Sequence, residues 1–158
     1  MRVLFVCLGN ICRSPTAEAV MRGLVREAGL EDRIEVDSAG TGSWHVGNPP
    51  DPRSTAAAKL RGIVMEGAAR TVSAEDFDAW DLLVAMDRAN QRELLSRAPD
   101  DAARAKVKLL REYDPASVAS GELEVPDPYY GGERGFDDVL DIVAAGCRGL
   151  LAELSARV

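Results

Sequence analysis

Short apolar runs alternate with helix-like segments along the chain, and this alternation limits the fold more than any other feature of the sequence. The clearest runs are RVLFV at 2–6 and DLLVAMD at 81–87. Unbroken apolar runs of this kind are typical of strands buried on both faces, as in parallel sheets. We expect strands at 2–6, 33–40, 81–87 and 106–110, and helices at 14–30, 51–62, 88–98 and 136–158. This order predicts an α/β fold with a parallel sheet.

Residues at the predicted helix ends support the assignment. Ser14 is a good N-cap and Pro15 suits the first helical position, while Asp51 and Pro52 repeat this pattern before the next helix. The last helix carries one apolar face that includes Cys147. Trp80 is expected in the core or at a helix–strand junction. We see no linker or internal repeat, so we expect one domain over residues 1–158.

Composition narrows the classes of protein that fit. The formal net charge of −7 disfavours general nucleic-acid binding, which rewards basic surfaces. Three cysteines in 158 residues do not make a disulfide framework. The N-terminus lacks the plan of a signal peptide, and no apolar run approaches the length of a membrane span. We therefore expect a soluble cytoplasmic protein without membrane contact, and a monomer by default.

The segment CLGNICRS at 7–14 lies between the first predicted strand and the first predicted helix. A loop that enters a helix N-terminus is an anion site, because its N–H groups and the helix dipole favour negative charge. Arg13 adds a planar fork that can hold two oxygens of one phosphate. Gly9 permits close backbone geometry. The plainer alternative is a buried thiol at Cys7 beside a surface arginine.

Cys7 lies at the base of this predicted anion site. The positive surroundings that bind phosphate also stabilise a thiolate, which is the nucleophilic form of cysteine. Ser14 can donate a hydrogen bond to that thiolate. The arrangement predicts attack of sulfur on phosphorus. The chain contains neither GxGxxG nor GxxxxGK[ST], so the usual glycine-rich nucleotide loops do not fit.

Two irregular segments, 40–51 and 115–135, are expected at the carboxyl edge of the sheet, where ligands bind in such folds. The second contains VPDPYYGG at 125–132, in which two prolines flank Asp127. A stiffened carboxylate there can protonate a leaving group and later activate water. From spacing alone, a simple turn aspartate is an equally good interpretation.

The whole chain resembles the low-molecular-weight protein tyrosine phosphatase family. The resemblance covers residues 2 to about 150 and rests on VLFVCLGNICRSPTAE, VDSAGT, NPPDPR, MDRAN and VPDPYYGG, of which the first and last are highly specific. It implies a single-domain three-layer α/β/α fold with a four-stranded parallel sheet. It also implies hydrolysis of phosphotyrosine and small aryl phosphates through a cysteinyl-phosphate, with no metal or organic cofactor.

The resemblance assigns roles residue by residue. It implies Cys7 as nucleophile, Arg13 as phosphate binder and Asp127 as general acid and then base. The implied phosphate-binding loop comprises Leu8, Gly9, Asn10, Ile11, Cys12 and Ser14, and Ser38 joins Asn10 and Ser14 in bracing it. One departure is Gly67, where the family often has a histidine that braces this network.

The resemblance also bears on substrate and regulation. It implies cleft walls at Trp44, Tyr129 and Tyr130, with Trp44 facing Tyr129 across a slot for a phosphorylated tyrosine ring. Bulky Ile11 resembles the tyrosine-type branch rather than the arginine-phosphate branch, which carries threonine there. The resemblance implies that Cys12 is the redox partner of Cys7. The alternative is that Cys12 is simply a packed thiol. His45, the single histidine, is expected at an exposed loop position.

Two rival functions remain open at this point. A thiol-dependent arsenate reductase shares the Cys-x5-Arg loop but needs further cysteines, and 82–94 contains none. A phosphate-binding module without turnover would not require Cys7, Arg13 and Asp127 together. The expected partners are phosphotyrosine-containing proteins and a tyrosine kinase that supplies them.

Overall fold

The N-terminal apolar run forms a central strand of a four-stranded parallel sheet. The computed structural model describes residues 1–129, 131 and 134–158. Its strands are β1 (Arg2–Cys7), β2 (Glu35–Gly40), β3 (Leu82–Ala85) and β4 (Val107–Leu109), in the order β2-β1-β3-β4. β1 pairs with β2 over its whole length and with β3 from Val3 to Val6. The expected α/β class with a parallel sheet is confirmed.

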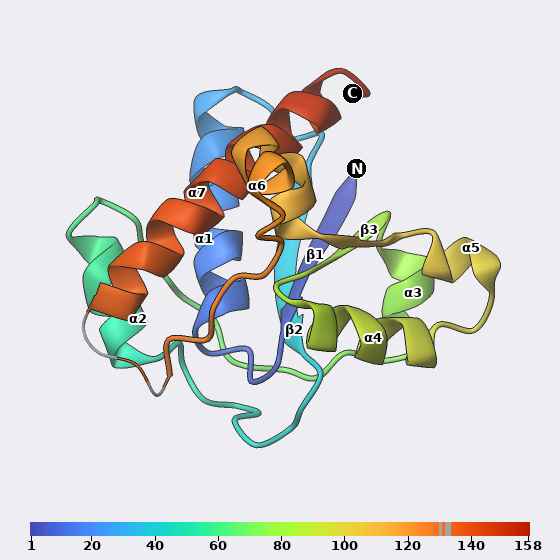
Figure 1. Ribbon diagram of the computed structural model, residues 1–158, viewed down its shortest axis with the longest axis horizontal. Helices are drawn as coiled ribbons and strands as arrows, with labels where there is room; N and C mark the ends of the chain where they lie inside the picture. Colours follow the sequence, from blue (N-terminus) through green and yellow to red (C-terminus); the bar gives the residue numbers. More distant parts are fainter. Residues whose placement is uncertain (130, 132–133) are drawn as a thin grey trace.

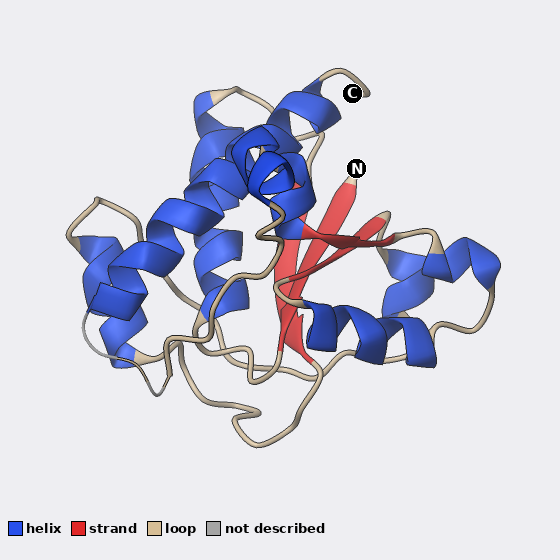
Figure 2. Ribbon diagram, viewed as in Figure 1, coloured by secondary structure: helices blue, strands red, loops and turns tan. Residues whose placement is uncertain are grey.

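Helices cover both faces of this sheet, which gives three layers (Figures 1 and 2). The helices on one side are α1 (Arg13–Glu27), α2 (Pro52–Lys59), α6 (Pro115–Ser120) and α7 (Arg134–Ser155), with the 3-10 turn η1 (Leu110–Tyr113). Those on the other side are α3 (Asp76–Ala79), α4 (Arg88–Arg97) and α5 (Asp101–Arg104). The longest helix, α7, lies across α1 (Figure 1).

The alternation of side chains along β1 divides the core into two parts. Val3, Phe5 and Cys7 lie in the apolar cluster beneath α1 and α7. Leu4 and Val6 lie in the cluster on the opposite side, beneath α3, α4 and α5. All five residues are at most 2% exposed, so the run had to be apolar at every position.

Most predicted elements lie within a few residues of their expected ends. The segment 115–135 departs from the prediction, because it is irregular only after α6, which spans Pro115–Ser120. Asp114 caps α6 and Gly121 ends it in the left-handed conformation at φ 77°. Trp80 and Cys147 are buried, as predicted, at 5% and 0% exposure.

The predicted N-cap of α1 is wrong. Ser14 lies inside the helix, which begins at Arg13, and Cys12 occupies the cap position without a side-chain cap bond. The reason is that the hydroxyl of Ser14 faces the sulfur of Cys7, 3.0 Å away, and is used there. Asp51 does cap α2, accepting a bond from the backbone N–H of Arg53.

We find no helix among the described residues that has both the length and the apolar character needed to cross a membrane.

Close packing of α7 against η1 depends on a glycine. A β-carbon built on Gly149 would lie 1.8 Å from the backbone oxygen of Tyr113. By contrast, a β-carbon on Gly23 in α1 would have nothing within 4 Å. The helix–turn contact therefore requires glycine at 149, whereas Gly23 is replaceable.

We predict that Gly149→Ala destabilises the protein by about 2–4 kcal/mol, because backbone must shift to admit the methyl group. The matched control Gly23→Ala should stabilise it by about 0.5–1 kcal/mol, since alanine is the better helix former. Urea unfolding followed by circular dichroism measures both. Equal stability changes for the two variants would contradict this account of the α7 interface.

Candidate active site

The loop that joins β1 to α1 curls around the sulfur of Cys7. The backbone N–H of Asn10 points at this sulfur at 3.3 Å. Cys7 is 2% exposed and lies at the carboxyl end of β1, and the loop 8–12 leads from it to the N-terminus of α1. The loop amides and the helix dipole thus favour negative charge at this place, as the sequence predicted.

Ser14 is positioned to donate a hydrogen bond to Cys7. The side-chain N–H of Asn10 donates to Ser14 Oγ at 2.8 Å, so that oxygen already serves as an acceptor. Its own hydrogen can then point to the sulfur 3.0 Å away or to the backbone oxygen of Ala39 at 3.4 Å, and the sulfur is the nearer of the two. A hydroxyl that donates to sulfur stabilises the thiolate form.

Asn10 connects the loop to two distant segments. Its Nδ2 also donates to Ser38 Oγ in β2 at 3.0 Å, and its Oδ1 accepts from the backbone N–H of Arg70 at 3.0 Å. Its φ of 56° is the left-handed conformation that asparagine tolerates better than most residues. At 4% exposure, this amide is a buried junction between three stretches of chain.

Gly67 offers no side chain to the network, whereas Glu18 of α1 braces it. Ser38 Oγ donates to Glu18 Oε1 at 2.6 Å. Glu18 is 7% exposed and also pairs with Arg22. Burial raises the pKa of Glu18 above its ordinary value, against the opposing effects of Ser38 and Arg22.

The guanidinium of Arg13 binds the carboxylate of Asp87 and faces that of Asp127. Its Nη1 donates to Asp87 Oδ2 at 2.6 Å and to the backbone oxygen of Val125 at 3.0 Å. Its Nη2 lies 3.5 Å from Asp127 Oδ2. Burial alone would lower the pKa of Arg13, but the negative partners Cys7, Asp87 and Asp127 hold it above its ordinary value. The guanidinium stays charged although the residue is 3% exposed.

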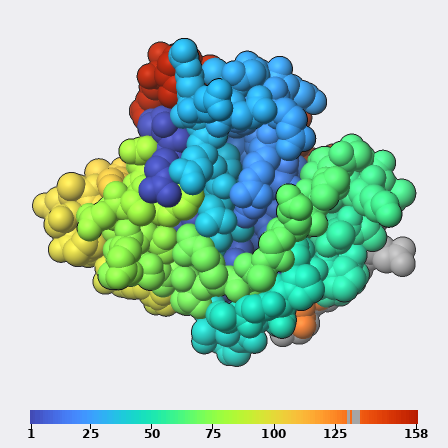
Figure 3. Space-filling view, turned by 180° about the vertical axis from the view of Figure 1, so that it is seen from behind, coloured from blue at the N-terminus to red at the C-terminus, as the bar shows by residue number. Residues whose placement is uncertain are grey.

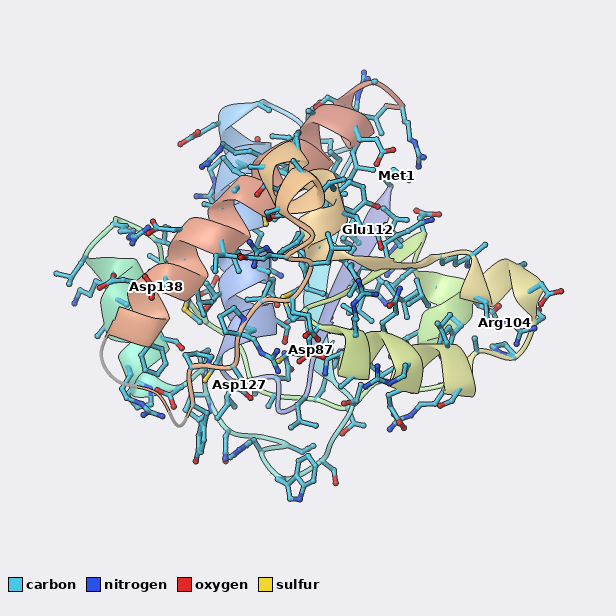
Figure 4. All side chains as sticks on the ribbon, viewed as in Figure 1. Met1, Asp87, Arg104, Glu112, Asp127 and Asp138 are labelled. Atoms are coloured by element: carbon cyan, nitrogen blue, oxygen red, sulfur yellow. The ribbon has the colours of Figure 1, made fainter. Side chains whose placement is uncertain are left out.

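Asp127 reaches the site from the loop after α6. Val125 donates a backbone hydrogen bond to Met86 at 2.8 Å, which fastens this loop beside the end of β3. Asp127 Oδ1 accepts from the backbone N–H of Tyr129 at 3.0 Å. Its side chain is 41% exposed and so remains open to water and ligand. Asp87 and Asp127 both lie at the carboxyl edge of the sheet (Figure 4).

A cavity of about 370 Å³ opens above Cys7. It is lined by Cys7, Leu8, Gly9, Ile11, Cys12, Arg13, Trp44, His45, Asp127 and Tyr129. The loop after β2 and the loop after α6 lie side by side at this end of the molecule (Figures 1 and 3). The structure therefore brings together residues from both ends of the chain.

The aromatic wall differs in one respect from the expectation. The ring that contacts Tyr129 is His45, with centroids 5.9 Å apart and planes tilted by 49°. His45 is partly buried and lines the cavity, which corrects its expected place in an exposed loop. Trp44 lines the cavity while remaining 72% exposed. The predicted wall residue Tyr130 lies outside the described residues.

The three cysteines occupy different surroundings. Cys7 and Cys12 are both free, buried thiols at the cavity. Burial raises the pKa of Cys12 to about 12, with a smaller opposing effect from Ser54. Cys147 is fully buried in the core, where burial raises its pKa further. Within residues 1–129, 131 and 134–158 we find no group of three or more histidine, cysteine or acidic side chains suited to a metal.

The sequence of the chain matches a known protein family. The family model described as "Low molecular weight phosphotyrosine protein phosphatase" matches residues 2–158. The chain belongs to this phosphatase family. The resemblance inferred from the motifs is thereby confirmed.

Individual family members are similar along nearly their whole length. A low molecular weight protein-tyrosine-phosphatase of Streptomyces coelicolor is 52% identical over 99% of this chain and 95% of its own. A protein tyrosine phosphatase of Entamoeba histolytica, solved with Hepes in the active site, superimposes with a TM-score of 0.93. The two sequences are 42% identical, and the superposition covers 99% of this chain and 97% of the Entamoeba chain. A Drosophila arginine phosphatase, DARP, has a TM-score of 0.89 at 36% identity, with 98% of each chain covered.

Sequence reasoning missed three residues of this phosphatase-family site. The sequence predicts Glu18 only as part of a helix and assigns no role to Asp87 or Arg70. Asp87 carries a usable signal, because it is the last residue of the predicted strand 81–87, at the edge where ligands bind. Glu18 and Arg70 carry none, since their contacts with Ser38 and Asn10 arise only from packing.

We predict that Asn10→Ala destabilises the protein more than Asn10→Gly, by about 1 kcal/mol. Both variants lose the three side-chain hydrogen bonds, but only glycine adopts the left-handed conformation freely. Guanidinium unfolding of the two variants gives the difference directly. Equal stabilities would show that the φ of 56° carries no strain for alanine at this position.

Proposed function

We propose that this chain hydrolyses phosphotyrosine in proteins, and small aryl phosphates, through a cysteinyl-phosphate formed on Cys7. The observation that carries the proposal is the geometry around one cavity. The sulfur of Cys7 lies at its base, and Arg13 and Asp127 line it from opposite segments of the chain. Membership of the phosphotyrosine phosphatase family supports the same reaction.

In the first step, the loop amides and the guanidinium of Arg13 bind the phosphoryl oxygens. The thiolate of Cys7 attacks phosphorus, forming the S–P bond as the bond to the phenolic oxygen breaks. Asp127, in its protonated form, delivers a proton to that oxygen, so the product leaves as neutral tyrosine. The 3.5 Å between Asp127 and Arg13 keeps the acid close to the bound phosphate.

In the second step, the Asp127 carboxylate takes a proton from water. The water oxygen attacks phosphorus, the S–P bond breaks, and inorganic phosphate forms while Cys7 leaves as a thiolate. Ser14 stabilises the departing thiolate through its hydroxyl, which lies 3.0 Å from the sulfur. Arg13 neutralises the charge on the transferring group in both steps.

The cleft favours a flat substrate ring. Trp44, His45 and Tyr129 provide aromatic walls, and buried Ile11 contributes apolar surface to the floor. We assign phosphotyrosine rather than phosphoarginine on this basis and on the bulk of Ile11. The partners are phosphotyrosine proteins and the tyrosine kinase that modifies them, and the enzyme acts as a monomer in the cytoplasm.

The decisive test compares Cys7→Ser, Asp127→Asn and the matched control Asp138→Asn, which changes an exposed carboxylate on α7 (Figure 4). Cys7→Ser should abolish hydrolysis of p-nitrophenyl phosphate in the presence of chelator. Asp127→Asn should lower kcat roughly 10²- to 10³-fold for phenyl phosphate, because this leaving group needs a proton. The loss should be smaller for p-nitrophenyl phosphate. Turnover that survives Cys7→Ser would overturn the mechanism.

We further infer that Cys12 protects Cys7 from irreversible oxidation. Peroxide converts the Cys7 thiolate to a sulfenic acid, and the Cys12 thiolate then displaces hydroxide to form a disulfide. A reductant restores both thiols. Because burial raises the pKa of Cys12 to about 12, only a small fraction is thiolate at neutral pH. Disulfide closure is therefore expected to accelerate with pH.

We predict that the rate of disulfide closure after peroxide treatment rises about tenfold per pH unit between pH 6 and 8, as the Cys12 thiolate fraction does. Mass spectrometry after alkylation counts the closed pairs. Dithiothreitol should restore activity in the wild type but not in Cys12→Ser after prolonged peroxide. A pH-independent closure rate would exclude Cys12 ionisation as the limiting step.

A further inference from the structure

The indole of Trp44 rests on Gly42 at the rim of the cavity. A β-carbon built on Gly42 would lie 1.9 Å from Cζ3 of Trp44, 2.4 Å from Cε3 and 2.8 Å from Cη2. Non-bonded atoms in proteins do not approach a β-carbon this closely. The six-membered ring of the indole therefore occupies the space where every other residue would carry its side chain.

The backbone at Gly42 does not itself require glycine. Its φ is not among the positive values found at the described glycines, so an L-residue could adopt it. Its position is nevertheless fixed, because its N–H donates to the backbone oxygen of Leu8 at 2.9 Å. Its own oxygen accepts from Thr71 Oγ1 at 3.3 Å. What a side chain at 42 would meet is the indole.

Trp44 needs such a support because water surrounds most of it. The residue is 72% exposed and lines two cavities, the one above Cys7 and a neighbouring groove of about 380 Å³. Leu8 also lines both, while Ala89, Asn90 and Glu93 of α4 line only the groove. The indole thus stands between the two hollows, and contact with Gly42 fixes it from the side of the loop.

A second rim ring also lies close to a glycine, with a looser fit. A β-carbon on Gly9 of the phosphate-binding loop would lie 3.0 Å from Cδ2 of His45. His45 in turn contacts Tyr129. Two neighbouring rings of the wall therefore lie against two glycines from different loops.

We propose that Gly42 is a specificity-determining position: its lack of a side chain seats Trp44 as the wall that binds the aryl group of the substrate. The proposal rests on the proposed function, since it names how that site selects aryl phosphates. A methyl group at 42 would turn the indole away from its seat. The phosphate-binding loop would keep its contacts, so affinity for phosphate itself would remain.

Gly42→Ala should lower the affinity for the aryl group and leave the stability of the fold nearly unchanged. An exposed indole can swing into water, so Gly42→Ala should shift the melting temperature by no more than about 2 °C. Aromatic contacts of this kind account for several-fold in affinity. We therefore expect loss of aryl binding without loss of the fold.

The test measures dissociation constants by calorimetry, with phenylphosphonate as the aryl probe and inorganic phosphate as the probe of the loop. Gly42→Ala should weaken phenylphosphonate binding roughly 3- to 10-fold and change phosphate binding by less than about twofold. Gly23→Ala serves as the glycine control and should change neither. Equal weakening for both probes, or for neither, would overturn the proposal.

A double-mutant cycle tests whether the effect passes through the indole. Without Trp44 the new methyl group has nothing to displace, so Gly42→Ala/Trp44→Ala should bind phenylphosphonate as Trp44→Ala alone does. If Gly42→Ala weakens binding equally in both backgrounds, Trp44 is not the mediator and the proposal fails.

A spectroscopic readout is independent of turnover and of ligand. Acrylamide should quench Trp44 fluorescence more strongly in Gly42→Ala than in the wild type, with a Trp44→Phe variant giving the contribution of buried Trp80. Unchanged quenching would overturn the proposal. Absence of phosphatase turnover in the wild type would instead count against the proposed function, while the quenching and binding results would still decide the role of Gly42.

Discussion

The side-chain amide of Asn10 joins three parts of the chain whose relative positions define the site. It donates to Ser14 at the start of α1 and to Ser38 in β2, and it accepts from the backbone N–H of Arg70. Because the amide is buried, each of these bonds replaces one to water and none can be given up cheaply. The curvature of the loop around Cys7, and hence the direction of its N–H groups, depends on this junction.

Local charge at the site opposes the charge of the whole molecule. The chain carries a formal net charge of −7, yet the cavity that we propose binds phosphate is lined by Arg13. The contrast is possible because Asp87 and Val125 engage Nη1 of Arg13, which leaves Nη2 on the side of Asp127. One buried guanidinium and a set of loop amides are therefore enough to make the cavity locally positive, since the electrostatic potential in a cleft depends mainly on its nearest groups.

The part of the site that is local in sequence was predictable from the residues alone. Cys7, Arg13 and Ser14 lie within eight positions, between a strand and a helix that both have clear patterns. Asp127 was not predictable in this way, because its position at the cavity depends on the backbone hydrogen bond between Val125 and Met86. Only the family resemblance selected it.

Other misses have similar physical causes. The contact of His45 with Tyr129 depends on how two loops fold against each other, which no periodicity encodes. The short helix α6 was missed although Asp114, Pro115 and Gly121 carry its capping signals, because its length supports no apolar period.

The placement of α7 has a consequence for how the chain matures. Val139, Val143, Cys147 and Leu154 of this last helix are buried in the same cluster as Cys7, which is made at the other end of the chain. During synthesis, β1 and α1 leave the ribosome early, but their shared apolar face stays bare until residue 154 has emerged. Cys7, the proposed nucleophile, is thus among the first residues to be made and among the last to acquire its surroundings. Activity is expected to arise in one late step rather than to grow with the nascent chain.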